Sequence, residues 1–126
     1  MTDESLAFID NALESAGINY EFGEYTSELQ YPYFVGEYTE TDVENEDGMQ
    51  ETSFILSGFS RDTWLTLEKA KNTIKKLFHP IEGRTAILKS GSGIAVFYAR
   101  SNNIPTGDYQ LKRIEIILTV KEWSVT

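Results

Sequence analysis

The segment from Thr63 to Phe78 constrains the fold of this chain more than any other part of the sequence. Its apolar residues recur at the three- and four-residue steps of an α-helix and form one stripe: Trp64, Leu67, Ala70, Ile74, Leu77 and Phe78. Ser60 or Asp62 is the expected N-cap, and His79-Pro80 ends the helix because proline has no amide hydrogen to donate. A helix with one apolar stripe must bury it, so we expect this helix to lie on a sheet.

A second helix is predicted near the N-terminus. Its apolar residues repeat at helical spacing, at Leu6, Ile9 and Leu13. Gly17 follows them and fits a left-handed C-terminal cap. Residues 18–22 then alternate between apolar and polar side chains, which is typical of a short strand, so Asn19 and Glu21 should face away from the core.

Two segments rich in aromatic and β-branched residues, 31–39 and 52–59, are predicted strands. An acidic connection joins them and ends at Gly48; its acids are Glu40, Asp42, Glu44, Glu46 and Asp47. We therefore predict a long β-hairpin with a charged tip. Connections of this length within a compact domain are often functional or disordered.

The remainder of the chain is rich in strand signals. Strands are predicted at 85–88, 94–99 and 109–120, with turns at 90–93 and 102–107. The element order is helix, strands, helix, strands, and a chain of 126 residues is most simply one domain. The sequence thus predicts an α+β fold over residues 1–126: two helices packed on a mostly antiparallel mixed sheet, with a long acidic β-hairpin.

Charge is divided unequally along the sequence, because the first basic residue is Arg61. Residues 1–60 hold 14 acids, whereas residues 61–126 hold 6 acids and all 11 bases, so the two parts carry −14 and +5. Such a split favours a directional contact between opposite charges. The candidate association residues are Glu37, Glu40, Asp42, Glu44, Glu46 and Asp47 on the acidic side, and Lys69, Lys76, Arg84 and Lys89 on the basic side. Alternatively, the two parts fold across each other and neutralise internally.

Motifs for catalysis or metal binding are missing. Cysteine is absent and His79 is the only histidine, which leaves mainly carboxylates as metal ligands. The acidic connection does not have EF-hand spacing, because Asp47 and Ser53 stand where that loop needs its glycine and last glutamate. Residues 90–93, SGSG, lack the P-loop pattern and predict a tight turn. We expect no catalytic, cofactor or metal site and no enzyme activity.

Membranes and nucleic acids are unexpected partners. No stretch approaches the roughly 18 apolar residues of a membrane span, and the N-terminus lacks the pattern of a secretion signal. The isoelectric point is about 4.5, whereas binding to a phosphate backbone requires clustered lysine and arginine. We expect a soluble cytoplasmic protein whose partners are proteins.

An aromatic group in the first part of the chain has two interpretations. It consists of Tyr20, Phe22, Tyr25, Tyr31, Tyr33, Phe34 and Tyr38. Aromatic residues in strands usually pack in the core or across strands. Tyrosine is also favoured at protein interfaces, so we expect some of these rings to remain partly exposed.

The arrangement of these elements resembles a known family. The YPYFVGEYTE strand opens a long hairpin, the ETSFILSGFSRD strand turns into the TWLTLEKAKNTIKKLF helix, and LKRIEIILTVKEW forms a final strand. With the N-terminal helix, this order is similar to that of the tail terminator, or tail-to-head joining, proteins of long-tailed bacteriophages and prophages. The resemblance implies a ring, usually a hexamer, that caps the tail tube and docks it to the head connector. It further implies assembly in the host bacterial cytoplasm, incorporation into the virion, and function through surfaces rather than through motif residues.

A different class of protein also fits the charge. A small acidic inhibitor or immunity-type protein would bind a basic protein partner by charge complementarity. The acids of the predicted hairpin would then form its binding surface.

Overall fold

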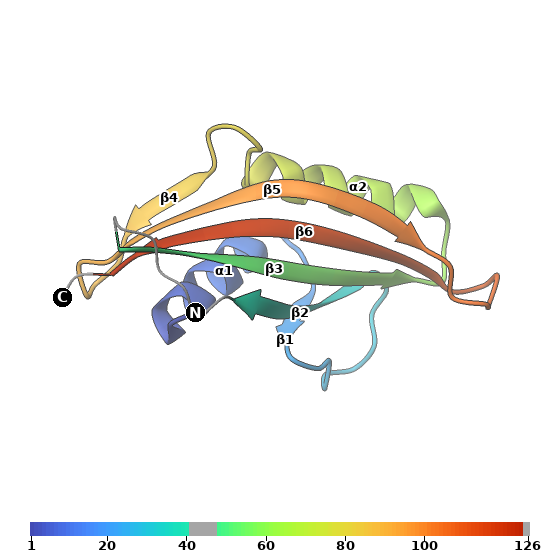
Figure 1. The fold of residues 1–126 in the computed structure, drawn as a ribbon. Helices are drawn as coiled ribbons and strands as arrows, with labels where there is room; N and C mark the ends of the chain where they lie inside the picture. The colour runs from blue at the N-terminus through green and yellow to red at the C-terminus, as the bar shows by residue number, and fades with distance from the viewer. Residues whose placement is uncertain (41–47, 125–126) are drawn as a thin grey trace.

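The computed structural model describes residues 1–40 and 48–124. In chain order its elements are α1 (Asp3–Ser15), β1 (Tyr20–Phe22), β2 (Tyr33–Glu40), β3 (Met49–Ser60), α2 (Trp64–Leu77), β4 (Arg84–Ile87), β5 (Gly93–Ile104) and β6 (Lys112–Trp123). The strands form one sheet in the order β1-β2-β3-β6-β5-β4, in which only β1 and β2 pair in parallel. The sheet curves strongly, and both helices lie against the same face (Figure 1). The predicted α+β fold is confirmed.

The N-terminal helix begins and ends as its sequence requires. Thr2 is the N-cap, and its side-chain oxygen accepts a hydrogen bond from the Ser5 amide at 3.2 Å. Gly17 has a φ of 77°, a left-handed conformation that costs glycine little, so the predicted C-terminal cap is confirmed. The chain leaves the helix through a hydrogen bond from the Ile18 amide to the Leu13 carbonyl.

The predicted cap of α2 is wrong. Thr63 is the N-cap and makes no side-chain capping bond. Ser60 instead ends β3, fully buried, and its hydroxyl accepts from the Asp62 amide at 3.1 Å. The Asp62 carboxylate accepts from the hydroxyl of Thr66 at 3.2 Å. Ser60 thus stabilises the turn between strand and helix, and Asp62 holds the first turn of α2 through the Thr66 hydroxyl rather than through a backbone amide.

The core lies between the helices and the sheet. Its fully buried members come from both helices and four strands: Ile9, Leu13, Phe34, Phe54, Leu56, Leu67, Ile74, Phe78, Val96, Ile116, Leu118 and Val120. Trp64 is an exception to the predicted helical stripe, because it is 39% exposed at the first turn of α2. Its ring lies instead beside the loop that joins β5 to β6.

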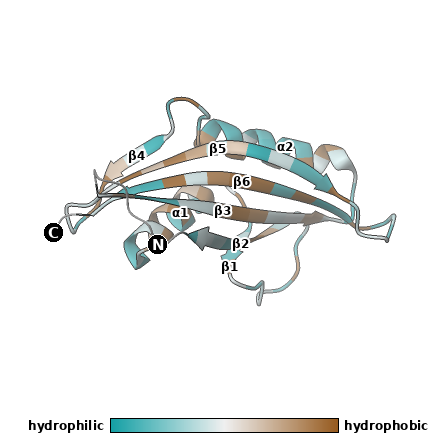
Figure 2. Ribbon diagram, in the orientation of Figure 1, coloured by the Kyte–Doolittle hydropathy of each residue, from teal (hydrophilic) through white to brown (hydrophobic). Residues whose placement is uncertain are grey.

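The last two strands extend further than their apolar residues suggest. Predicted turn residues Asn102 and Asn103 lie within β5 and pair with Glu115 and Ile114 of β6. Figure 2 shows why the prediction failed, since this half of β5 is hydrophilic while the neighbouring part of β6 is apolar. The last strand begins three residues later than predicted, at Lys112, after a loop over residues 105–111.

The predicted acidic hairpin is present where the structure describes it. β2 and β3 pair antiparallel from Tyr33 and Phe59 to Glu40 and Thr52. Glu40 is exposed, and its carboxylate accepts a hydrogen bond from the amino group of Met1. Four of the candidate association residues in the hairpin lie outside the described residues: Asp42, Glu44, Glu46 and Asp47.

Burial of a tyrosine beside α1 predicts a dependence of stability on alkaline pH. Burial raises the pKa of Tyr20, and the nearby Asp10 carboxylate raises it further. Above pH about 10 the Tyr20 hydroxyl therefore loses its proton in the unfolded chain but keeps it in the folded protein. The contribution of Tyr20 to the free energy of unfolding is present below that pH and is lost as the pH rises beyond it. We expect Tyr20→Phe to flatten the decline of the unfolding free energy above that pH, as measured by urea titration.

A matched control is Tyr109→Phe, because Tyr109 is 87% exposed. This change should leave the alkaline decline as it is in the parent protein. An equal decline in the parent protein and in Tyr20→Phe would contradict the assignment.

Candidate interaction surfaces

The face of the sheet opposite the helices, which we call the open face, carries no helix in the described part of the chain (Figure 1). Strand alternation places on it every second residue of the central strands. Ile55 and Ile117 pair near its centre, and Ile117 is only 6% exposed. This face therefore combines partly buried apolar residues with polar ones, and the helices leave it free.

An arginine–aromatic ladder crosses one end of the open face. Tyr33 and Phe59 stand opposite each other on β2 and β3, with ring centroids 5.1 Å apart. The Tyr31 ring lies 5.5 Å from that of Tyr33. A guanidinium group lies at each end: Arg113 is 5.6 Å from the Phe59 centroid, and Arg61 is 5.9 Å from the Tyr31 centroid. Cations at these distances are attracted to the electron-rich faces of the rings.

The loop between β1 and β2 extends the ladder with one more ring. The Tyr25 ring lies 4.7 Å from that of Tyr33. Its hydroxyl donates to the Asn19 side-chain oxygen at 2.8 Å, and the Asn19 amide group donates to the Gln30 carbonyl at 2.9 Å. Asn19 thus faces away from the core, as predicted, and ties both ends of the loop together.

Glu21 fixes the middle of the same loop. Its carboxylate accepts hydrogen bonds from the Thr26 hydroxyl at 2.9 Å and from the Ser27 amide at 3.1 Å. Partial desolvation opposes ionisation, but the bonds from Thr26 and Ser27 outweigh it and lower the pKa of Glu21. The Glu21 carboxylate therefore stabilises the loop through these two hydrogen bonds.

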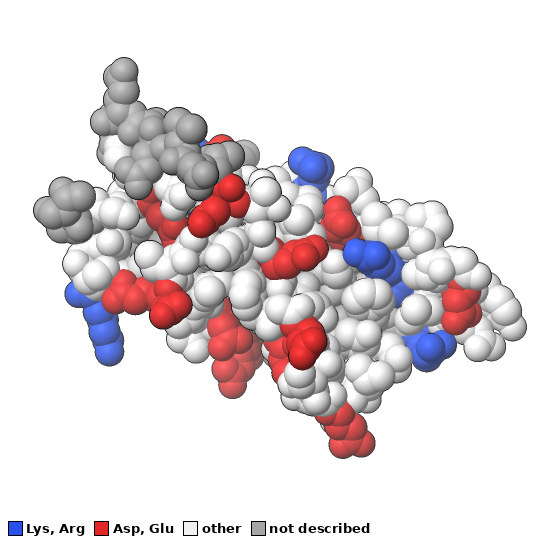
Figure 3. Space-filling model, turned by 60° about the horizontal axis from the view of Figure 1, so that its bottom comes forward, with Lys and Arg blue, Asp and Glu red and all other residues white. Residues whose placement is uncertain are grey.

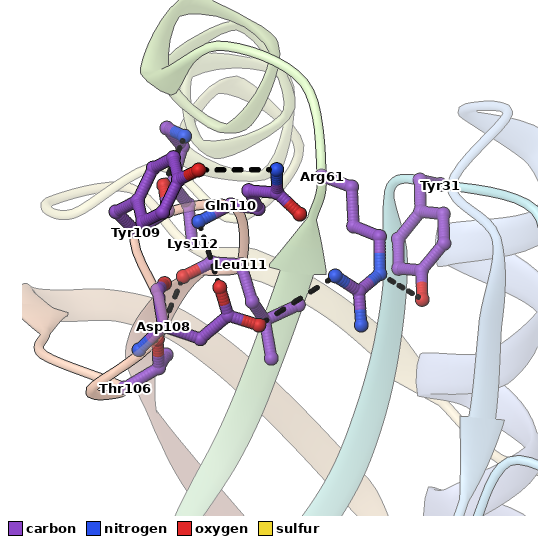
Figure 4. Close-up of polar contacts among 8 residues, drawn as sticks. All are labelled: Tyr31, Arg61, Thr106, Asp108, Tyr109, Gln110, Leu111 and Lys112. Atoms are coloured by element: carbon purple, nitrogen blue, oxygen red, sulfur yellow. Dashed lines mark hydrogen bonds and ion pairs between the residues drawn. The ribbon is translucent and has the colours of Figure 1, made fainter.

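Arg61 joins the ladder to the loop between β5 and β6 (Figure 4). Its Nε donates to the Tyr31 hydroxyl at 3.2 Å, and its Nη1 lies 3.7 Å from the Asp108 carboxylate. The bond to Tyr31, reinforced by Asp108, raises the pKa of Arg61. Within the loop, the Thr106 hydroxyl donates to the Leu111 carbonyl at 2.8 Å. Both groups of the Arg61–Asp108 pair are about half exposed, so the guanidinium remains accessible.

Arg113 lies at one end of the ladder. Among the described residues, no carboxylate forms an ion pair with it. One terminal nitrogen donates to the Ser57 hydroxyl at 3.3 Å. Its Nε is buried and has no hydrogen-bond partner in the described part of the chain. The ladder therefore ends in a cation whose hydrogen-bonding capacity is only partly used.

Ion pairs do not join the acidic and the basic parts of the sequence within the described residues. The three pairs there are the Met1 amino group with Glu40, Arg61 with Asp108, and Lys71 with Glu68. Figure 3 shows acidic side chains spread over most of one side of the molecule, with basic ones mainly toward its ends. Internal neutralisation, the alternative raised by the sequence, is not observed among these residues.

The structure separates the predicted association residues. Glu37 and Glu40 are exposed on β2, toward one edge of the sheet. The basic candidates are exposed as well, on α2, on the opposite edge strand and in the turn after it: Lys69, Lys76, Arg84 and Lys89. They form two surfaces rather than one site. The ladder arginines and Phe59 were missed, because only the pairing of β3 with β2 and β6 brings them together.

One groove of the described surface lies beside the ladder residue Tyr31. This groove of about 550 Å³ lies between the end of α1, α2 and residues 30–34, and Lys69 and Tyr31 are its ionisable lining residues. Among the described residues, no three metal-ligating side chains gather in one place. None of the helices in this part of the chain has the length and apolar character needed to cross a membrane.

Comparison with known proteins gives a fold relationship. No family model matches the sequence, and no curated protein sequence matches it. The structure is similar to a chain of the "Virion of native gene transfer agent (GTA) particle", with a TM-score of 0.64 and 12% sequence identity. The alignment covers 90% of this chain and 84% of that chain. The protein thus shares nearly its whole fold with a chain of a virion particle.

Proposed function

We propose that this protein is a structural subunit of a phage or phage-like virion, which caps the tail tube and joins it to the head connector as an oligomeric ring. The observation that carries the proposal is the shared fold with a gene transfer agent virion chain over 90% of the sequence. In this proposal the protein is not an enzyme and needs no cofactor. Its partners are other copies of itself, the tail tube protein and the connector protein, first in the host bacterial cytoplasm and then in the virion.

The separation of charge supports a ring. Subunits in a ring meet through two different surfaces, because each surface must bind the other one on the next copy. Here Glu37 lies toward one edge of the sheet and Arg84 on the opposite edge strand, and neither is in an ion pair among the described residues. Surfaces of opposite charge fix the direction of such a contact.

Capping of tail tubes tests the proposed function. Purified protein would be mixed with tail tubes that lack their terminal protein and examined by electron microscopy. We expect a ring at one end of each tube, an end to further tube growth, and joining to connector-bearing heads. Absence of end binding would refute the function. Capture of one basic protein in a one-to-one complex, without tube binding, would favour an inhibitor instead.

The basic surface of α2 gives a variant for the same assay. Lys69 and Lys76 are exposed and outside the described ion pairs, so Lys69→Gln with Lys76→Gln should remove charge without unfolding the helix. We expect fewer capped tubes at a given protein concentration, and a smaller effect of added salt than in the parent protein. Lys71→Gln is the control, because Lys71 already pairs with Glu68 within the helix. Equal capping by the double variant and the parent would exclude this surface.

A further inference from the structure

We propose that the arginine–aromatic ladder binds the acidic stripe of α1 from a second copy of this chain. The stripe consists of Asp3, Ala7, Asp10 and Glu14, which are all exposed and follow each other at helical spacing. This contact rests on the proposed function, since it would join neighbouring subunits of the ring, and it names two surfaces that would bind in addition to the charged edges of the sheet.

The two surfaces cannot meet within one molecule. α1 packs on the covered face of the sheet, with Ile9 and Leu13 in the core. The ladder lies on the open face, where Tyr33 and Phe59 project away from the helices. The sheet therefore lies between the stripe and the Tyr33–Phe59–Arg113 part of the ladder, and the stripe of another copy can reach this part from the open face. Repetition of such a front-to-back contact gives a closed ring or an open filament.

The charges of the two surfaces are complementary. α1 contains no basic residue, and its stripe offers three carboxylates. The ladder offers the guanidinium groups of Arg61 and Arg113, of which the first has only a long contact to an exposed carboxylate and the second has none among the described residues. Arginine binds carboxylates through short, paired, charge-assisted hydrogen bonds.

The spacing of the acids along α1 suits a contact with more than one cation. At a rise of 1.5 Å per residue, Asp3 and Glu14 are about 16 Å apart along the helix axis. The carboxylates of Asp3, Asp10 and Glu14 are spread over this length, so the stripe offers the ladder arginines several places at which to bind one. Neighbouring groups of the ladder lie 5.1 to 5.9 Å apart, and the ladder bends back on itself, because Arg61 follows Phe59 by two residues along the chain. Tyrosine and arginine, with tryptophan, are enriched among the residues that dominate the binding energy of interfaces.

Two variants separate the halves of the contact. The ladder variant is Arg61→Gln with Arg113→Gln, and the stripe variant is Asp10→Asn with Glu14→Gln. Each removes two charges, and because Arg113 is partly buried, urea unfolding would check that both variants remain folded. The control for each sign of charge lies elsewhere on the surface, outside the candidate association residues: Lys75→Gln and Glu82→Gln, both at exposed positions.

Sedimentation velocity at low salt tests the contact with the purified protein alone. We expect the parent protein to self-associate with rising concentration. The affinity of each double variant for itself should be lower by a factor of at least about ten. An equimolar mixture of the two variants should form dimers and nothing larger, because the ladder variant still carries an intact stripe and the stripe variant an intact ladder. The two controls should behave as the parent protein does.

Three results would overturn the proposal: a parent protein that stays monomeric up to its solubility limit, double variants that associate as the parent does, or a mixture that forms no dimer. The outcome is independent of tube capping. Dimers in the mixture without capping would refute the tail function and leave the contact standing. Capping by the parent and by both variants alike would leave the function standing and exclude the contact.

Discussion

Replacing Phe54 by alanine is expected to lower the free energy of unfolding by about 3–5 kcal/mol. Phe54 is fully buried in β3, between Tyr38 of β2 and Leu118 of β6. Its ring also lies 6.4 Å from that of Tyr20. Alanine would leave a cavity where the sheet meets the helices, and these neighbours are held by their own strands and cannot collapse into it. Urea unfolding, followed by tryptophan fluorescence, measures the loss.

Ile81→Ala is the control for this prediction. Ile81 is 83% exposed in the connection after α2, so its truncation should change the free energy of unfolding by less than about 0.5 kcal/mol. The dependence of that free energy on urea concentration should be the same in both variants and in the parent protein. A loss below about 1 kcal/mol for Phe54→Ala would show that the ring is not in the core.

The second large loss of stability is expected when a glycine, rather than a large residue, is replaced. Gly58 pairs with Phe34 across β2 and β3, and a Cβ atom added there would lie 2.3 Å from Cε2 of the Phe34 ring. Phe34 is 1% exposed, so its ring has no free space to enter. We expect Gly58→Ala to lower the free energy of unfolding by about 1–3 kcal/mol through overpacking.

A second substitution identifies the cause of this loss. In the background of Gly58→Ala, Phe34→Leu should cost less than it does in the parent protein, because the ring that clashes is gone. Gly93→Ala serves as the control, since the nearest side-chain atom would be 3.6 Å away, at ordinary contact distance. If Gly58→Ala and Gly93→Ala were equally mild, the close packing of Phe34 on β3 would be disproved.

Much of this fold could be predicted from the sequence because apolar residues repeat with the period of their element. Ile116, Leu118 and Val120 alternate along β6 and are all buried as the pattern requires. This apolar repeat gives no signal where the side chains of a strand are exposed. Asn102 and Asn103 continue β5 at exposed positions, so backbone pairing with β6 determines their conformation. Their side chains do not indicate a strand in the sequence.

The interaction surfaces show the same limit. The division of charge along the sequence predicted exposed acidic and basic residues in separate places, and every such candidate among the described residues is exposed. The ladder was not predicted, because Phe59 and Arg113 are far apart in the sequence and meet only through the register of β3 with β6. Tyr31 and Tyr33 were noted as aromatic residues, but their stacking required the fold of the loop before β2.

The lengths of the central strands limit how a chain of this design can diverge during evolution. β3, β5 and β6 each have 12 residues, and one alternating set in each strand contributes to the core. A single inserted residue inside β6 would turn every following side chain to the wrong face unless a bulge absorbed it. Point substitutions of similar volume carry no such penalty. Related chains should therefore keep strand length long after they lose sequence identity, and gain or lose residues mainly in connections such as 105–111.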